Sequence, residues 1–402
     1  MNKGSITTPA GFRASGVSCG IKGDDQLDLA LIACECPATV AGVFTTNRIK
    51  GHSLQWTLEK IVSRKKASAL IVNSGNANAC VGKQGAADAH EIAELTAKEL
   101  KVPVDQILLG STGVIGVPLD MKKIRSGIKS AVKALDDSAE AAHLANQAML
   151  TTDTKTKEIA VDFPISYDHA SIGGMAKGSG MIHPNLATMI AVITTDVRIT
   201  PECLQQALSQ TVYNTFNRIS ADGETSCCDM VVVMSSGLAD HPLISDLNSA
   251  EGHIFMENLR YVATGLSRMI AADGEGASKL VTVRVCGAAN EADAYFGALA
   301  VAKSPLAKTA IFGEDANWGR IINALGYSGA NFNPAQLDIS IGDLLVCHEG
   351  MATDFSEKKA KEILQRREVL IQINFNQGYC DDHFWTCDFT DDYIRINADY
   401  RS

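Results

Sequence analysis

Short apolar runs recur along the chain, and several contain the β-branched residues typical of buried strands. The strands that these runs predict cover residues 27–34, 41–48, 67–73, 106–109, 189–195, 229–235, 279–286, 369–375 and 393–398. Only one of them alternates clearly, with Val281, Val283 and Val285 on one face and more polar positions between them. We therefore expect the strand at 279–286 to be half-buried.

Helical spacing of apolar residues separates many of these strands. The helices that it predicts cover residues 86–100, 121–135, 139–150, 201–216, 254–272 and 293–304. The glycine-rich stretch 173–180 is interpreted as a loop leading to the strand at 189–195. No repeat or low-complexity linker interrupts the pattern, so we predict an α/β fold of α+β layers, with mixed sheets flanked by helices.

Composition narrows the function. The 402 residues suffice for two or more domains, with 46% hydrophobic and 20% charged residues. A formal net charge of −10 argues against nucleic acid and anionic membranes as partners, because both bind basic surfaces. We see neither a secretory h-region near Met1 nor an apolar run of about 18 residues, and expect a cytoplasmic protein.

The eleven cysteines show no metal-binding spacing. The two close pairs, Cys34 with Cys36 and Cys227 with Cys228, lack the Cys-x-x-Cys interval, and no histidine stands at a matching distance. We expect buried free thiols and no metal site.

Three motifs could carry chemistry, and each also has a structural interpretation. Thr112 and Gly113 follow a predicted strand, where backbone N–H groups and a hydroxyl could hold an oxyanion or simply form a tight turn. Lys177 stands among glycines, so its ammonium could enter a cleft or remain solvated. Glu275 lies between Gly274 and Gly276, where a carboxylate could meet a ligand's ammonium or face solvent.

Thr188 directly precedes the predicted strand at 189–195 and follows the small residue Ala187. It could be an ordinary strand threonine. Alternatively, its hydroxyl could attack the carbonyl of Ala187, and hydrolysis of the resulting ester would free the Thr188 amine. That amine, with an unperturbed pKa of about 7.7–8.0, could then act as base for its own hydroxyl. The residues themselves leave both interpretations open.

Taken together, the motifs resemble those of the ornithine acetyltransferase family of arginine biosynthesis, over nearly the whole chain. The segments that carry the resemblance are 42–48 (GVFTTNR), 73–80 (NSGNANAC), 111–116 (STGVIG), 151–154 (TTDT), 174–181 (GMAKGSGM), 183–189 (HPNLATM), 317–321 (NWGRI) and 397–402 (NADYRS). Residues 225–229 (TSCCD) depart from the usual Thr-Ser-Thr-Asn-Asp-like stretch, and the terminal Ser402 replaces a threonine.

The resemblance implies an N-terminal-nucleophile enzyme that cleaves itself between Ala187 and Thr188, giving an α chain of residues 1–187 and a β chain of residues 188–402. Acetyl would pass from N-acetylornithine to Thr188 and then to glutamate. Thr112 and Gly113 would form the oxyanion hole. The substrate-binding residues implied are Thr151, Lys177, Thr188, Glu275, Asn397 and Ser402.

The resemblance further implies a heterotetramer of two α and two β chains and no cofactor. Some members also use acetyl-CoA as a co-substrate, and no single residue decides whether this chain does. Two alternatives stay open: a self-processing amidohydrolase or aminopeptidase, in which water takes the acyl group, and an uncleaved binding protein for acetylated amino acids.

Overall fold

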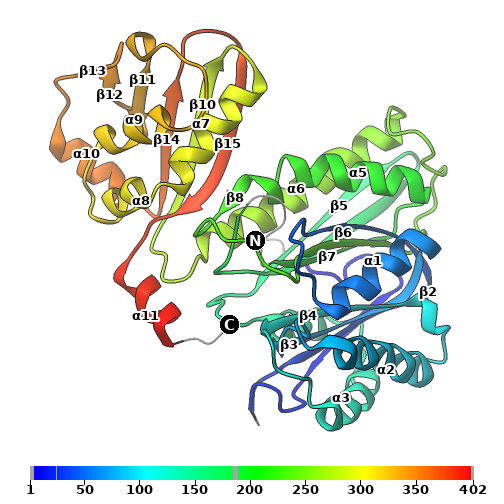
Figure 1. Cartoon of the computed structure of the whole chain (residues 1–402). Helices are drawn as coiled ribbons and strands as arrows, with labels where there is room; N and C mark the ends of the chain where they lie inside the picture. Colours follow the sequence, from blue (N-terminus) through cyan, green and yellow to red (C-terminus); the bar gives the residue numbers. More distant parts are fainter. Residues whose placement is uncertain (1–3, 24, 184–188, 400–402) are drawn as a thin grey trace. The chain divides into compact units, whose positions relative to one another are not determined.

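The computed structural model describes residues 4–23, 25–183 and 189–399. Its chain divides into two compact units (Figure 1). The larger unit contains residues 4–217 and 224–266, and the smaller unit contains residues 218–223 and 267–399. None of the helices in the described ranges combines the length and apolar character needed to span a membrane.

The larger unit is built on one mixed sheet in the order β4-β3-β2-β9-β7-β6-β5, with β1 paired to β2. Its strands are β1 (Phe12–Val17), β2 (Leu29–Phe44), β3 (Lys66–Asn76), β4 (Ile107–Val114), β5 (Lys157–Ile165), β6 (Asp168–Lys177), β7 (Ile190–Thr195) and β9 (Met230–Ser235). β3 and β4 are parallel, as are β7 and β9, and the other pairs are antiparallel. The mixed sheet confirms the predicted fold class.

The long strand β2 joins the two halves of this sheet. Its pairing with β3 shifts register between Ala33 and Ala38, after which it pairs with β9. The strands predicted at 27–34 and 41–48 are therefore one irregular strand. Apolar side chains from both halves, such as Val72 and Val232, share one buried cluster.

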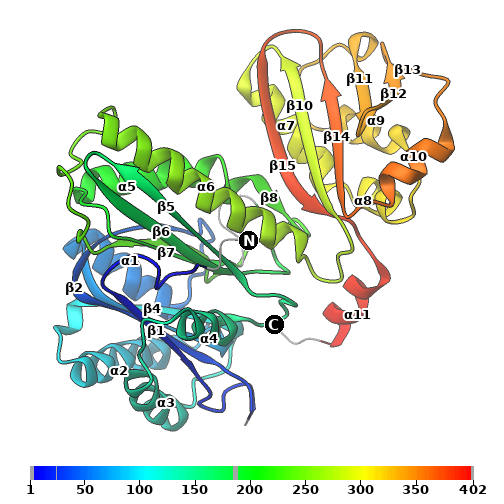
Figure 2. The same ribbon diagram turned by 180° about the vertical axis from the view of Figure 1, so that it is seen from behind.

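Six helices belong wholly or mostly to the larger unit: α1 (His52–Arg64), α2 (Gly82–Leu100), α3 (Met121–Lys133), α4 (Ala139–Met149), α5 (Pro201–Tyr213) and α6 (Ala250–Ala272). α6 packs against β5 and β6, and α5 packs against β2, whereas α2 packs against β4 and α3 against β1 and β2 (Figures 1 and 2). Asp120, Ser138 and Thr200 accept hydrogen bonds from first-turn amides, which fixes where three of these helices begin. Five of the six predicted helices lie in this unit, as α2 to α6, and are confirmed within a few residues. The sequence did not predict α1.

The stretch 173–180 is not wholly a loop, because Gly173 and Gly174 lie inside β6. A Cβ atom on Gly173 would stand 2.0 Å from the backbone oxygen of Ser5. One on Gly174 would stand 2.9 Å from side chains of α6. These glycines allow close packing on both faces of a strand, a demand that local sequence does not reveal.

The smaller unit holds a second sheet in the order β13-β12-β11-β14-β10-β15-β8. Its strands are β8 (Ile219–Ser220), β10 (Leu280–Ala288), β11 (Asp338–Ile341), β12 (Leu344–His348), β13 (Met351–Ala352), β14 (Glu368–Asn374) and β15 (Cys380–Cys387). Its helices include α7 (Glu291–Lys303), α8 (Pro305–Phe312), α9 (Trp318–Gly326), α10 (Glu357–Leu364) and α11 (Asp391–Asp399). Val281, Val283 and Val285 are fully buried, as their alternation predicts.

The strand predicted at 393–398 is wrong, because these residues form α11. Asp391 and Asp392 stand in its first turn, where acidic residues favour a helix, and the Thr390 hydroxyl accepts a hydrogen bond from the Asp392 amide. Tyr393 and Ile394 resemble strand residues only when read without these preceding signals.

Candidate functional site

Thr112 and Gly113 lie within the last residues of β4, and not in a turn after it. They pair with Ser74 and Gly75 of the parallel strand β3. Gly113 has a φ of +127°, and a Cβ atom there would stand 2.4 Å from the carbonyl carbon of Gly75. Only glycine fits here, because a side chain would collide with the backbone of β3.

Buried side chains of α1, β3 and β4 form hydrogen bonds beside this backbone. Ser111 donates a hydrogen bond of 2.6 Å to Asn73 Oδ1 and shares one of 2.7 Å with Ser53. Asn73 Nδ2 in turn donates to the carbonyl oxygen of Asn76 at 2.8 Å. The network fixes the ends of β3 and β4 together.

Lys177 and Thr151 are in direct contact. Lys177 Nζ donates a hydrogen bond of 2.8 Å to Thr151 Oγ1, and the lysine is buried at 2% exposure. The interpretation of Lys177 as a solvated surface lysine is therefore wrong. Lys177 is the last residue of β6, and Thr151 and Asp153 are the partners that its buried ammonium contacts.

Asp153 balances the charge of two buried lysines. It lies 2.7 Å from Lys157 Nζ and 3.6 Å from Lys177 Nζ, and it accepts the Gly178 amide at 2.6 Å. Burial opposes ionisation of Asp153, but the two ammonium groups and the amide together hold its pKa well below the usual range. Half-buried Lys22 donates to the carbonyl oxygen of Leu150 at 2.8 Å, and burial lowers its pKa.

The first residues of β7 lie between β6 and β9. Lys177 pairs with Ile190 in the antiparallel register of β6 and β7. On the β9 side, the Met189 amide donates to Asp229 Oδ1 at 2.9 Å. The residues that immediately follow the predicted nucleophile are thus flanked by Lys177 and Asp229, although Ala187 and Thr188 themselves lie outside the described residues.

Cys227 and Cys228 link this region to the segment after β3. Both are buried free thiols, as predicted, and their sulfur atoms lie 3.4 Å apart. The contact lowers the pKa of Cys227 to about 7 and raises that of Cys228, which burial raises further. Cys228 Sγ contacts the carbonyl oxygen of Ala77. The Ala77 amide in turn donates a hydrogen bond to the carbonyl oxygen of Val114, the residue after Gly113.

The smaller unit brings Glu275 and Asn397 together. Asn397 Nδ2 donates to Glu275 Oε2 at 2.7 Å and to the carbonyl oxygen of Tyr393 at 2.9 Å. Gly276 has a φ of +69°, and a Cβ atom on it would stand 2.6 Å from the Tyr393 amide nitrogen. The glycine therefore lets α11 pack closely against the turn that contains Glu275. Glu275 is buried, so the interpretation as a solvent-facing turn is wrong. Ser402 lies outside the described residues.

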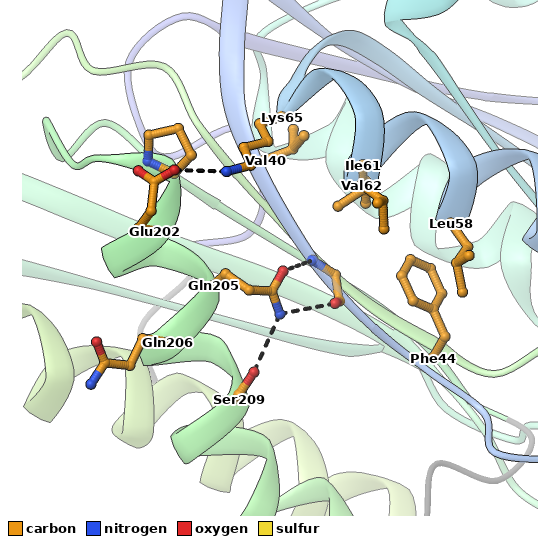
Figure 3. A pocket seen from close by; sticks show the side chains of 12 residues that line it. Val40, Phe44, Leu58, Ile61, Val62, Lys65, Glu202, Gln205, Gln206 and Ser209 are labelled. Atoms are coloured by element: carbon orange, nitrogen blue, oxygen red, sulfur yellow. Dashed lines mark hydrogen bonds and ion pairs between the residues drawn. The ribbon is translucent and has the colours of Figure 1, made fainter.

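A pocket of about 670 Å³ opens elsewhere on the larger unit, between α1 and α5 (Figure 3). Its lining is largely apolar, and Gln205 crosses it to hydrogen-bond both backbone groups of Gly42. None of the predicted site residues that the structure describes lines it. Its charged lining residues, Lys65 and Glu202, pair with each other at 2.7 Å, and the pocket is separate from the predicted site.

Three residues of the site were missed in the sequence: Asp153, Lys157 and Asp229. Asp153 belongs to the quoted segment 151–154, and Lys157 follows it by four residues, so a polar pair before an apolar run was visible. Asp229 was interpreted only as the start of a strand. No local pattern distinguishes a buried carboxylate from an exposed one, since its partners come from other strands.

Comparison with known proteins gives consistent results. A sequence model of the ArgJ family matches residues 13–402. The chain is 44% identical to the arginine biosynthesis bifunctional protein ArgJ 1 of Clostridium acetobutylicum over 100% of this chain and 98% of that protein. It is 44% identical to the arginine biosynthesis bifunctional protein ArgJ of Symbiobacterium thermophilum over 99% of each chain.

Among solved structures, the chain is similar to the arginine biosynthesis bifunctional protein ArgJ of Bacillus halodurans, with 45% identity and a TM-score of 0.50. The match covers 52% of this chain and 97% of that chain.

Proposed function

The chain belongs to the ArgJ family, and from this membership we propose that it is an acyltransferase of arginine biosynthesis that moves acetyl from N-acetylornithine to glutamate. The observation that carries the proposal is the 44% identity over the full length of bifunctional arginine-biosynthesis proteins. The buried contact between Lys177 and Thr151, two residues implied in substrate binding, supports it locally.

The chemistry that we propose begins with self-cleavage. Thr188 Oγ1 adds to the carbonyl carbon of Ala187, the Ala187–Thr188 C–N bond breaks, and the shift leaves an ester and a free Thr188 amine. Water then hydrolyses the ester. This gives residues 1–187 a new carboxyl terminus and residues 188–402 a new amino terminus.

Transfer then uses the same hydroxyl. The Thr188 amine takes the Oγ1 proton while the oxygen attacks the acetyl carbon of N-acetylornithine, and ornithine leaves. The amine of glutamate next attacks the acetyl-threonine ester, giving N-acetylglutamate and restoring Thr188. Thr112 and Gly113 stabilise the oxyanion of each tetrahedral intermediate.

Two observations support the cleavage step. Strands from before and after the proposed cut, β6 and β7, are hydrogen-bonded neighbours in one sheet, so the two products would stay associated. The Bacillus halodurans chain is 97% covered yet matches only 52% of this one, a length expected of one product of a mid-chain cut. The proposed cut between residues 187 and 188 does not coincide with the boundary between the two compact units, because the larger unit contains residues from both products.

The proposal extends to a heterotetramer of two α and two β chains in the cytoplasm, with substrate contacts from Glu275, Asn397 and Ser402 and no cofactor. Acetyl-CoA as a second acetyl donor fits the word bifunctional in the relatives' names. Native mass measurement is the test of assembly. A particle of twice the 42.8 kDa chain mass is expected, and a particle of single chain mass contradicts it.

Product analysis tests the reaction. Purified protein incubated with N-acetylornithine and glutamate should release ornithine and N-acetylglutamate in equal amounts. Ornithine with free acetate instead would identify an amidohydrolase, and binding without products would identify a binding protein. Repeating the assay with acetyl-CoA and glutamate decides whether the chain has the second activity.

A further inference from the structure

The Asp229 carboxyl is fully buried at the start of β9. Its Oδ1 atom accepts the Met189 amide at 2.9 Å, and the next residue, Met230, donates its amide to the Met189 carbonyl oxygen at 3.0 Å. Both polar backbone groups of Met189 are therefore hydrogen-bonded by two consecutive residues, Asp229 just before β9 and Met230, its first residue. Met189 follows Thr188 in the chain, so these two hydrogen bonds fix the residue next to the proposed nucleophile.

The environment of the second carboxyl oxygen, Oδ2, differs from that of a carboxylate in a buried ion pair. Asp229 Oδ2 is buried and has no hydrogen-bond partner among the described residues. Burial raises the pKa of Asp229 well above its usual value, and the Met189 amide and the Lys177 charge only partly oppose this. A buried polar atom without a partner is uncommon in folded proteins. The hydrogen bond that the described residues place on this carboxyl is the one from the Met189 amide to Oδ1.

We propose that Asp229 is a positioning residue for Thr188, which acts through the Met189 amide by fixing the peptide unit that follows the nucleophile. The inference rests on the function proposed above. An acceptor is needed at Oδ1, and a negative charge is not. Asparagine meets this requirement, whereas leucine fills similar space and leaves the Met189 amide without its acceptor.

Asp196 offers a matched control at the other end of β7. It is also a buried carboxylate, and it accepts the amides of Ser171 at 2.8 Å and Ala10 at 3.0 Å. Replacing it removes comparable hydrogen bonds from the same sheet without touching Met189. It therefore reports what general loosening of this sheet does to activity.

The experiment compares the parent with Asp229→Asn, Asp229→Leu, Asp196→Asn and Asp196→Leu, measuring the cleaved fraction over time, the melting temperature, and kcat and KM per cleaved molecule. Asp229→Asn should keep cleavage and kcat within about threefold of the parent. Asp229→Leu should slow cleavage and lower kcat about 10- to 100-fold with little change in KM. Both Asp196 variants should lower the melting temperature and leave kcat unchanged.

Two results would overturn the inference: parent-like kcat and cleavage in Asp229→Leu, or a loss in Asp229→Asn as large as in Asp229→Leu. If the leucine variant does not fold, Asp229→Asn decides alone, because a loss above tenfold shows that the charge is needed. A parent that neither cleaves nor transfers refutes the proposed function instead, so the two failures remain distinguishable.

Discussion

Lys177 Nζ donates a hydrogen bond of 2.8 Å to Thr151 Oγ1, joining the last residue of β6 to the segment that precedes β5. The ammonium also faces Asp153 at 3.6 Å, so its position is set from two directions. A buried ammonium fixed in this way can orient an anionic or carbonyl group of a substrate without reorganising.

Thr151→Val should lower kcat/KM about tenfold, because valine keeps the shape and removes the hydroxyl that holds Lys177. Thr151→Ser restores the hydroxyl and should recover most of the activity. Steady-state kinetics of both variants check this. Equal losses in the serine and valine variants would show that the methyl group, and not the Lys177 contact, is what matters.

Gly113→Ala should lower kcat about 10²- to 10³-fold, the loss expected when an oxyanion donor is displaced. The added Cβ atom cannot fit 2.4 Å from the Gly75 carbonyl carbon, so the end of β4 must move. The measurement is kcat at saturating substrate, with the melting temperature as a check of folding.

Gly116→Ala is the matched control for that variant. Gly116 also has a positive φ, +78°, but a Cβ atom on it meets nothing within 4 Å. It should cost about 1 kcal/mol of stability and leave kcat near the parent value. If both alanine variants lose activity alike, backbone strain explains the effect and Gly113 has no special role.

Acid stability should depend on Asp153. Its pKa is lower in the folded protein than the value of about 3.9 in an unfolded chain. The ionised group therefore stabilises the fold fully above that pH, and this contribution is lost as pH falls through the lower folded pKa. In the Thr188→Ala background, which we expect to remain one chain, Asp153→Asn should lower the free energy of unfolding by about 3–5 kcal/mol at pH 7.

The difference between this variant and its Asp153 parent should shrink as pH falls from about 4 to about 2. Urea unfolding at several pH values measures it. A difference that stays constant over this range would mean that the charge of Asp153 contributes nothing to the stability it provides.

Glu275→Gln should raise KM for N-acetylornithine about 10- to 100-fold, because glutamine can still accept from Asn397 but cannot pair with the substrate's side-chain ammonium. KM for glutamate, whose side chain ends in a carboxylate, should not rise. Initial rates with each substrate varied in turn give both constants. A rise in both would assign Glu275 to holding Asn397 and α11 in place.

Much of the fold follows from local pattern. Apolar runs predicted β3, β7, β9, β10 and β14, and helical spacing predicted α2 to α7. Residues 393–398 were misread because the helix-start signals at 390–392 were overlooked, whereas 173–174 were misread because their packing partners are distant in the sequence. Gly173 stands in β6 because only a residue without a side chain leaves room for the Ser5 backbone there.

The site was predicted unevenly for the same reason. Lys177 and Glu275 were visible between glycines, but chemistry alone could not separate them from surface residues. The resemblance to a family supplied Thr151 and Asn397, whose contacts the structure then located in separate units. Neither approach predicted Asp229, because its contact is with the amide of Met189, just before β7, a residue distant in the sequence.

The direct test of the central claim is intact mass combined with N-terminal sequencing of the purified protein. We predict two chains that together account for the 42.8 kDa precursor plus one water, the second beginning at Thr188. Thr188→Ala should stay full-length and inactive, whereas Thr188→Ser should cleave and keep part of the activity. A full-length, uncleaved chain that still transfers acetyl groups would contradict the account.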